Sequence, residues 1–170
     1  MTKSTHNYTV VETAAGWVAL AGRNGKVSAI EFPKPTREEA VAVLRAGIDG
    51  ELVESNEGFD PLAGQLRDYF AGNRTEFTFE PDLADLTEFQ RKVLRTTMTV
   101  PYGSVVSYRW IAEKAGHPGA FRAAGQALGR NPVPIAIPCH RVVASGGKLG
   151  GFSGGLHWKE KMLAMEGVEI

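Results

Sequence analysis

The first candidate for chemistry is a cysteine next to a histidine. Cys139 is the only cysteine among 170 residues, and His140 follows it in the segment 131–143, NPVPIAIPCHRVV. A free thiol, with a pKa of about 8.5, is only a few per cent thiolate at neutral pH, so a cysteine that attacks carbon needs a base or a positive neighbour. Neighbouring side chains of an extended chain point to opposite sides, which favours a water between the two residues over direct contact. The pair makes Cys139 a candidate nucleophile, but a lone cysteine is more often buried and inert, so the pair alone is weak evidence.

The composition excludes several other kinds of site. A single cysteine excludes an internal disulfide framework, and the four histidines are too scattered to suggest a structural zinc site. We therefore expect no metal and no cofactor. The chain contains no apolar run long enough for a signal peptide or a membrane helix, which predicts a cytoplasmic protein.

Charge is distributed unevenly although the formal net charge is zero. Residues 1–90 contain 8 Lys and Arg against 15 Asp and Glu, whereas residues 91–170 contain 11 against 4. An acidic half joined to a basic half indicates a basic working domain that attracts polyanions. A chance distribution over solvated faces is the alternative.

The elements of the first half predict a small α+β domain over residues 1–80. Residues 8–32 read as three antiparallel strands with breaks at 13–16 and 23–25. Thr36 and Glu39 form a capping box for a helix to about residue 46, and a second helix extends from Asp60-Pro61 to about Phe70. Polar and apolar residues alternate over 75–79, which predicts another strand.

After an acidic linker, 81–86, the chain predicts a helical domain over residues 87–170. Thr87 and Gln90 form a capping box for a helix to about residue 97. Ser107 can cap a helix over 108–114, which Gly116 ends, and a further helix covers 120–129. Two short helices around a tight turn predict a helix-turn-helix, and the second contains mostly small side chains.

Five motifs between residues 89 and 167 carry a resemblance to a known family. They are VPYGSVVSY, RAAG, NPVPIAIPCHRVV, GGFSGG and the terminal MEG, in this order. The chain resembles the O6-alkylguanine-DNA alkyltransferases, also called methylated-DNA–protein-cysteine methyltransferases. The resemblance implies an α+β fold: a small ribonuclease H-like domain of antiparallel sheet plus helix, then a mostly helical domain with a helix-turn-helix. The first 70 residues resemble the family only in length and general composition.

The resemblance implies a role for each candidate catalytic residue. Cys139 is the acceptor of the alkyl group, His140 removes its proton through a water, and Glu166 orients His140. Tyr108 donates to guanine N3 and stabilises the charge that develops as the base leaves. Asn131 ties the turn before the cysteine, in addition to ending a helix as Asn-Pro would anyway.

The same resemblance implies how damaged DNA is held. A stacked base must be flipped out of the duplex before a protein nucleophile can reach it. Arg122 fills the gap that the base leaves, and four small residues make the helix thin enough for the minor groove: Ala123, Ala124, Gly125 and Ala127. Phosphate contacts are expected from the basic half, including Arg91, Arg95, Arg109 and Arg130.

The resemblance also implies that the glycine-rich segment 150–155 lines the base pocket. Ser153, with backbone N–H groups that include Gly154, would face guanine O6, and Phe152 stands where many members have tyrosine. The backbone carbonyls of Cys139 and Val142 would accept from the guanine amino group and select guanine.

These residues predict an enzyme of direct-reversal DNA repair that accepts an alkyl (methyl) group on Cys139 irreversibly, once per molecule. We expect a monomer on double-stranded DNA, with cooperation along the DNA left open. A protein that binds alkylguanine without chemistry is the main alternative. A cysteine hydrolase and a helix-turn-helix regulator are weaker ones, since an adjacent Cys-His pair is not peptidase spacing and the second helix has few base-reading side chains.

Overall fold

The computed structural model describes residues 4–73, 76–144, 146, 148–152 and 154–169. They divide into two compact units, Met1–Leu83 and Ala84–Ile170. The boundary between the units falls inside the segment 81–86. No helix in the described ranges has the length and the apolar character needed to cross a membrane.

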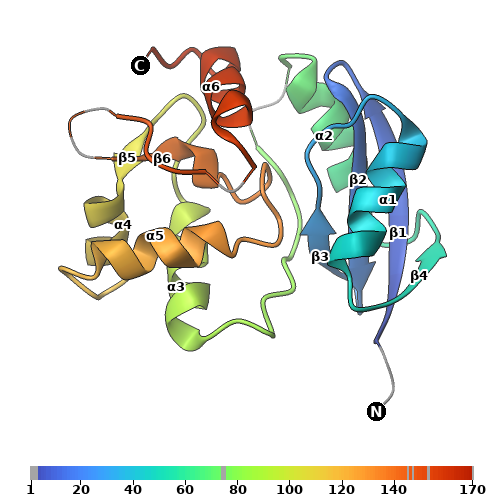
Figure 1. Ribbon diagram of the computed structural model, residues 1–170, viewed down its shortest axis with the longest axis horizontal. Coiled ribbons are helices and arrows are strands. Elements are labelled where there is room, and N and C mark those ends of the chain that lie inside the picture. The colour runs from blue at the N-terminus through green and yellow to red at the C-terminus, as the bar shows by residue number, and fades with distance from the viewer. Residues whose placement is uncertain (1–3, 74–75, 145, 147, 153, 170) are drawn as a thin grey trace. The chain divides into compact units, whose positions relative to one another are not determined.

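The described part of the first unit contains a four-stranded sheet in the order β3-β2-β1-β4 (Figure 1). The expected meander is confirmed: β1 (Ser4–Thr13), β2 (Gly16–Arg23) and β3 (Lys26–Ile30) pair antiparallel. The β2-β3 turn has positive φ at Asn24 (54°) and Gly25 (75°), the pattern of a type I′ hairpin. β4 (Gly50–Glu54), which was not expected, pairs parallel with the β1 edge.

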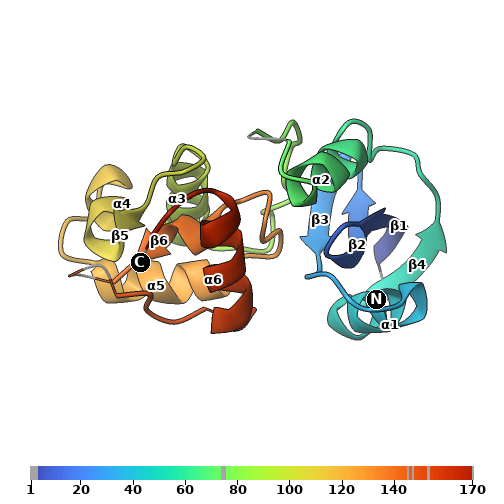
Figure 2. The same ribbon diagram turned by 90° about the horizontal axis from the view of Figure 1, so that it is seen from above.

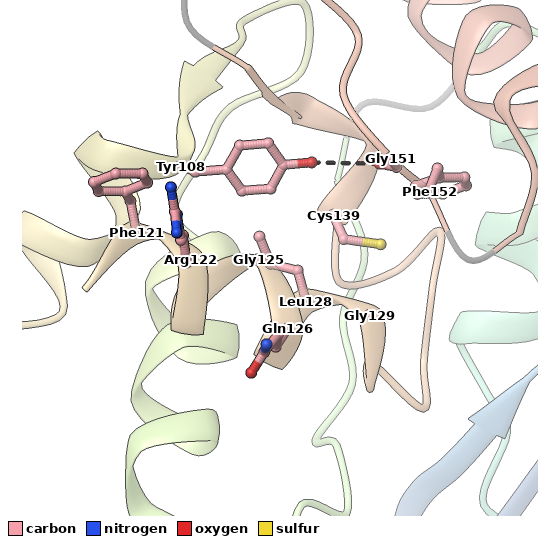
Figure 3. Close-up of a pocket in the computed structure, with 10 residues that line it drawn as sticks. All are labelled: Tyr108, Phe121, Arg122, Gly125, Gln126, Leu128, Gly129, Cys139, Gly151 and Phe152. Carbon is pink, nitrogen blue, oxygen red and sulfur yellow. Dashed lines mark hydrogen bonds between the residues drawn. The ribbon is translucent and has the colours of Figure 1, made fainter. Parts of the chain in front are cut away.

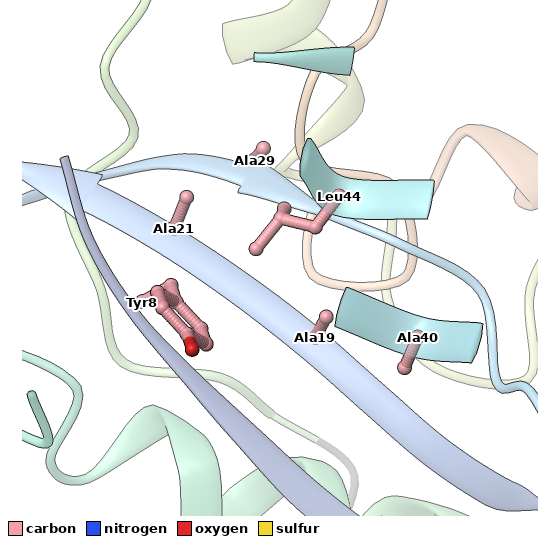
Figure 4. Packing of buried hydrophobic residues seen from close by; sticks show 6 residues of the cluster. All are labelled: Tyr8, Ala19, Ala21, Ala29, Ala40 and Leu44. Atoms are coloured by element: carbon pink, nitrogen blue, oxygen red, sulfur yellow. The ribbon is translucent and has the colours of Figure 1, made fainter. Parts of the chain in front are cut away.

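Two helices cover this sheet on opposite faces (Figure 2). They are α1 (Arg37–Gly47), whose first turn is capped by the Thr36 side chain, and α2 (Leu62–Phe70). Strand β2 is buried throughout its centre, as a strand between two layers must be. Small side chains on the sheet let α1 approach closely (Figure 4); the cluster consists of Tyr8, Ala19, Ala21, Ala29, Ala40 and Leu44.

The prediction of a strand over 75–79 is wrong for the described residues 76–79, which form none. Thr78 is held by a side chain instead of a neighbouring strand: its backbone N–H donates to the Gln65 side chain at 2.7 Å. The Phe77 ring lies 5.4 Å from that of Tyr69. The alternation therefore reflects anchoring to α2, and a backbone pairing with Val27 forms only around Pro81.

Three helices of the second unit form where they were predicted, and they pack together. Helix α3 (Glu88–Thr97) begins with the complete Thr87–Gln90 capping box and contacts both α4 (Tyr108–Lys114) and α5 (Phe121–Gly129). The Ser107 side chain caps α4 by accepting from the Trp110 N–H at 3.0 Å. Helices α4 and α5 contact each other across the turn 115–120, which is the expected helix pair.

The remaining elements bring the cysteine segment against α4. Strand β5 (Val106–Ser107) pairs parallel with β6 (Val142–Val143). The assumption of an extended chain at Cys139 is wrong, because Cys139–Arg141 forms a 3-10 turn, η1, directly before β6. Helix α6 (Leu156–Met165), which was not expected, contacts η1.

Candidate functional site

A pocket of about 610 Å³ in the second unit opens beside the cysteine (Figure 3). It lies between the start of α4, the length of α5, the cysteine turn and the glycine-rich segment after β6. Its lining includes Tyr108, Phe121, Arg122, Gly125, Gln126, Leu128, Gly129, Cys139, Gly151 and Phe152. The predicted nucleophile, tyrosine and arginine thus share one cavity.

Cys139 is held at the pocket by the loop that precedes it. The Asn131 side chain donates to the Ile137 carbonyl at 3.1 Å and accepts from the Val133 N–H at 2.9 Å, so it links the two ends of this turn. The Cys139 residue is only 5% exposed. Burial raises the pKa of its thiol to about 11, while a hydrogen bond from Asn131 and the charge of Lys159 act in the opposite direction. At neutral pH Cys139 is therefore a thiol, and its proton must be removed for attack.

His140 and Glu166 form a buried pair behind the cysteine. His140 Nε2 lies 2.6 Å from Glu166 Oε2, and the His140 side chain is fully buried. A carboxylate can only accept, so Nε2 carries the proton and Nδ1 is left as an acceptor. Burial lowers the pKa of His140, against an opposing effect of Glu166. His140 is consequently neutral at physiological pH, as a general base must be.

Arg141 completes this cluster and had no role assigned from the sequence. Its Nε and Nη2 donate to the two oxygens of Glu166 at 2.7 and 3.2 Å, and its Nη1 donates to the Val100 carbonyl at 2.8 Å. Glu166 Oε1 also accepts from the Gly103 N–H at 3.2 Å. These donors fix the position of the Glu166 carboxylate, which also holds the His140 imidazole. An arginine inside the apolar run 131–143 is the signal that could have identified it.

Tyr108 crosses the pocket from the start of α4. Its hydroxyl donates to the Gly151 carbonyl at 3.3 Å, the dashed line in Figure 3. A Cβ added at Gly125 would lie 3.7 Å from the ring, and one added at Gly150 only 3.0 Å from the hydroxyl, so two glycines flank it closely. Burial raises the pKa of Tyr108, which keeps the hydroxyl protonated and able to donate.

Helix α5 presents only part of its predicted DNA-contact set to solvent. Arg122, Ala123 and Arg130 are exposed and Gly125 is half-buried. The expectation that Ala124 and Ala127 face DNA is wrong for this structure, because both are buried on the side where α5 packs on α3 and α4. Small size at these two positions serves helix packing instead.

Lys159, on α6, is the main site residue that the sequence did not reveal. It is fully buried, and its ammonium donates to the carbonyls of Val142 at 2.7 Å, Gly151 at 3.3 Å and Leu149. Burial lowers its pKa to about 8. The signal that could have identified Lys159 was its spacing from Met162, a buried residue that follows three positions later on the same helix face.

The residues expected to line the base pocket differ in burial and in hydrogen bonding. Val142 is buried in β6, and its carbonyl, expected to accept from guanine, already accepts from Lys159, leaving one lone pair. Phe152 is half-buried, with the Lys159 ammonium 5.8 Å from its ring centroid. Gly154 is half-buried, and Ser153 lies outside the described residues. Among those residues no group of three His, Cys, Asp or Glu could hold a metal.

Comparison with known proteins defines the class of the second unit. The family model of the 6-O-methylguanine DNA methyltransferase DNA binding domain matches residues 88–168. This range contains the helix pair, the cysteine turn and Glu166, so the pocket belongs to that class of domain.

Relatives extend the match over nearly the whole chain. A methylated-DNA–protein-cysteine methyltransferase from Mycolicibacterium paratuberculosis is 43% identical over 159 residues, covering 94% of this chain and 91% of that protein. The one from Shigella flexneri is 45% identical over 153 residues, covering 89% and 88%. The crystal structure of Mycobacterium tuberculosis O6-methylguanine methyltransferase is 36% identical, covers 95% of this chain and 92% of that one, and has a TM-score of 0.76. The same organism's OGT in complex with DNA matches with a TM-score of 0.76 and 35% identity, over 95% of this chain and 93% of that one.

The chain belongs to the family of methylated-DNA–protein-cysteine methyltransferases. The family, the enzyme class and the α+β fold expected from the sequence are confirmed.

Proposed function

We propose that the protein repairs duplex DNA by moving an alkyl group, above all methyl, from O6 of a flipped guanine to Cys139. The observation that carries the proposal is a buried thiol on a pocket, backed by a neutral histidine that a carboxylate holds. The new C–S bond is a thioether without an easy leaving route, so each molecule reacts once and irreversibly.

His140 takes the proton of the thiol. Its Nδ1 is buried and has no hydrogen-bond partner among the described residues. One water between Sγ and Nδ1 would pass the proton to the imidazole as sulfur attacks the alkyl carbon. Glu166 then faces an imidazolium through the hydrogen bond that it already makes.

Tyr108 assists the departure of guanine. As the C–O6 bond breaks, its electron pair moves to O6 and into the purine ring. The Tyr108 hydroxyl exchanges its hydrogen bond with Gly151 for one to guanine N3 and stabilises this charge. The backbone N–H of Gly154 would face O6, and the carbonyls of Cys139 and Val142 would face the amino group.

The DNA is bound through the start of α5 in the minor groove. Arg122, exposed and on the pocket rim, occupies the space of the flipped nucleotide. Ala123 and Gly125 keep the helix thin there, and Arg130 contacts phosphate. We further expect a cytoplasmic monomer that needs no cofactor.

The deciding experiment mixes the protein with excess duplex that contains O6-methylguanine and measures intact protein mass and repaired DNA. We expect one methyl group on Cys139 and one repaired base per protein molecule. Cys139→Ser should abolish transfer and retain DNA binding, and Glu166→Gln should slow transfer. Tight binding of damaged DNA by unmodified protein would favour an alkylguanine-binding protein, and repeated turnover would refute the single-use mechanism.

A further inference from the structure

Phe121 is a large apolar side chain at an exposed position beside the pocket. It is the first residue of α5, directly before Arg122, and it is 38% exposed. It also lines the pocket, and Figure 3 shows its ring next to Arg122. Single exposed apolar residues are common on soluble proteins, but this one borders the cavity that must receive a base.

The ring is also held in place by a charge. The Arg109 guanidinium, on the first turn of α4, lies 5.6 Å from the centroid of the Phe121 ring. A cation over an aromatic face is attracted to the ring, by about 0.5–1 kcal/mol at exposed sites. Arg109 and Arg122 place two positive charges beside the ring, where a polyanion would bring its backbone.

We propose that Phe121 is a DNA wedge: its ring inserts at the base step beside the flipped nucleotide and stacks on the base left there. This inference rests on the proposed function and adds a second residue to the opening of the duplex. Phenylalanine is among the apolar side chains that enter the minor groove and unstack a base step. Arg122 replaces the missing base by charge and hydrogen bonding, whereas Phe121 supplies a π-face to its neighbour.

The test compares a duplex with a substrate that needs no opening. Single-turnover methyl transfer is measured on a duplex with O6-methylguanine and on a trinucleotide whose central base is O6-methylguanine. Phe121→Ala should slow the duplex reaction about tenfold or more relative to the trinucleotide reaction, a difference equivalent to about 1.4 kcal/mol. Phe121→Trp should keep the duplex rate, because its ring can still stack. Val43→Ala, on α1, removes an apolar side chain of similar exposure (37%) and should change neither reaction.

Each outcome separates the wedge from other roles. Equal duplex rates for wild type and Phe121→Ala would overturn the inference and leave the repair function intact. Equal losses on both substrates would also overturn it, because Phe121 would then act on the pocket and not on the duplex. Failure of the wild type to accept methyl from either substrate would instead refute the proposed function.

Discussion

Replacing Lys159 by methionine removes the ammonium that links β6 to Leu149 and Gly151 and keeps the side chain length. The carbonyl of Val142, on a fully buried residue, loses its 2.7 Å donor. An unsatisfied buried acceptor costs about 1–3 kcal/mol. Leu149 and Gly151 are less buried, so water can replace the donor there. Relief from burying a charge offsets part of the loss, and we expect a net decrease of about 1–2 kcal/mol in the free energy of unfolding at pH 7.

The pH dependence makes this prediction specific. The pKa of Lys159 is lowered to about 8 from 10.5, so between these values the unfolded chain binds a proton that the folded protein does not. Through this group the wild type gains stability as pH rises, by about 1.4 kcal/mol per pH unit above the folded pKa. The deficit of Lys159→Met should therefore grow between about pH 7 and pH 9.5.

Urea unfolding at both pH values measures the deficit, and single-turnover transfer measures the consequence for the pocket. We expect transfer by Lys159→Met to fall about tenfold, since the Leu149–Gly151 carbonyls lose their tether. Lys161→Met is the matched control, because Lys161 lies on the exposed side of the same helix. A deficit that stays constant or shrinks with pH would refute the role of a buried charge, and unchanged transfer would refute the role in the pocket.

Three further predictions concern the pocket. Gly150→Ala should cost about 1–2 kcal/mol of stability because φ is +73° there, and it should slow transfer because its Cβ would lie 3.0 Å from the Tyr108 hydroxyl. Gly146→Ala, with φ of +78° and no atom within 4 Å of the added Cβ, should lose similar stability in a melting assay but keep the transfer rate. The transfer rate on duplex should stay level from neutral pH down to pH 6.5 and fall only below it, because burial lowers the pKa of His140 and a protonated imidazole cannot accept the thiol proton. The free energy of unfolding should fall over the same acidic range. A transfer rate already halved at pH 7 would contradict this. S-Methylation of Cys139 should lower the free energy of unfolding by about 1–3 kcal/mol through overpacking, and equal calorimetric stability of the methylated and free protein would contradict it.

Local signals predicted most of the fold. The capping residues Thr87 and Ser107 and the turn Asn24-Gly25 depend on atoms within a few positions, so the sequence suffices to place them. The predictions failed where a segment pairs with residues far away in the sequence. β4 depends on the exposed edge of β1, and the alternation at 76–79 was satisfied by a glutamine on α2.

The site could be predicted in its chemistry but not in its burial. Cys139 and His140 are visible from residue type, and Glu166 became visible through the family motif. Arg141 and Lys159 were given no role from the sequence, because only tertiary packing decides that a cation is enclosed by carbonyls and carboxylates. The same packing buried Ala124, which the family resemblance had suggested for the DNA face.

The high pKa of the Cys139 thiol has a consequence for the lifetime of the protein in a cell. Oxidants and small electrophiles select exposed thiolates, and a 5% exposed thiol with a pKa of about 11 offers them almost none. Because the protein can react only once, each reaction of Cys139 with an oxidant or electrophile would inactivate one molecule without repairing DNA. Storing the nucleophile in its protonated form, with the base arranged behind it, preserves every molecule until a damaged base enters the pocket.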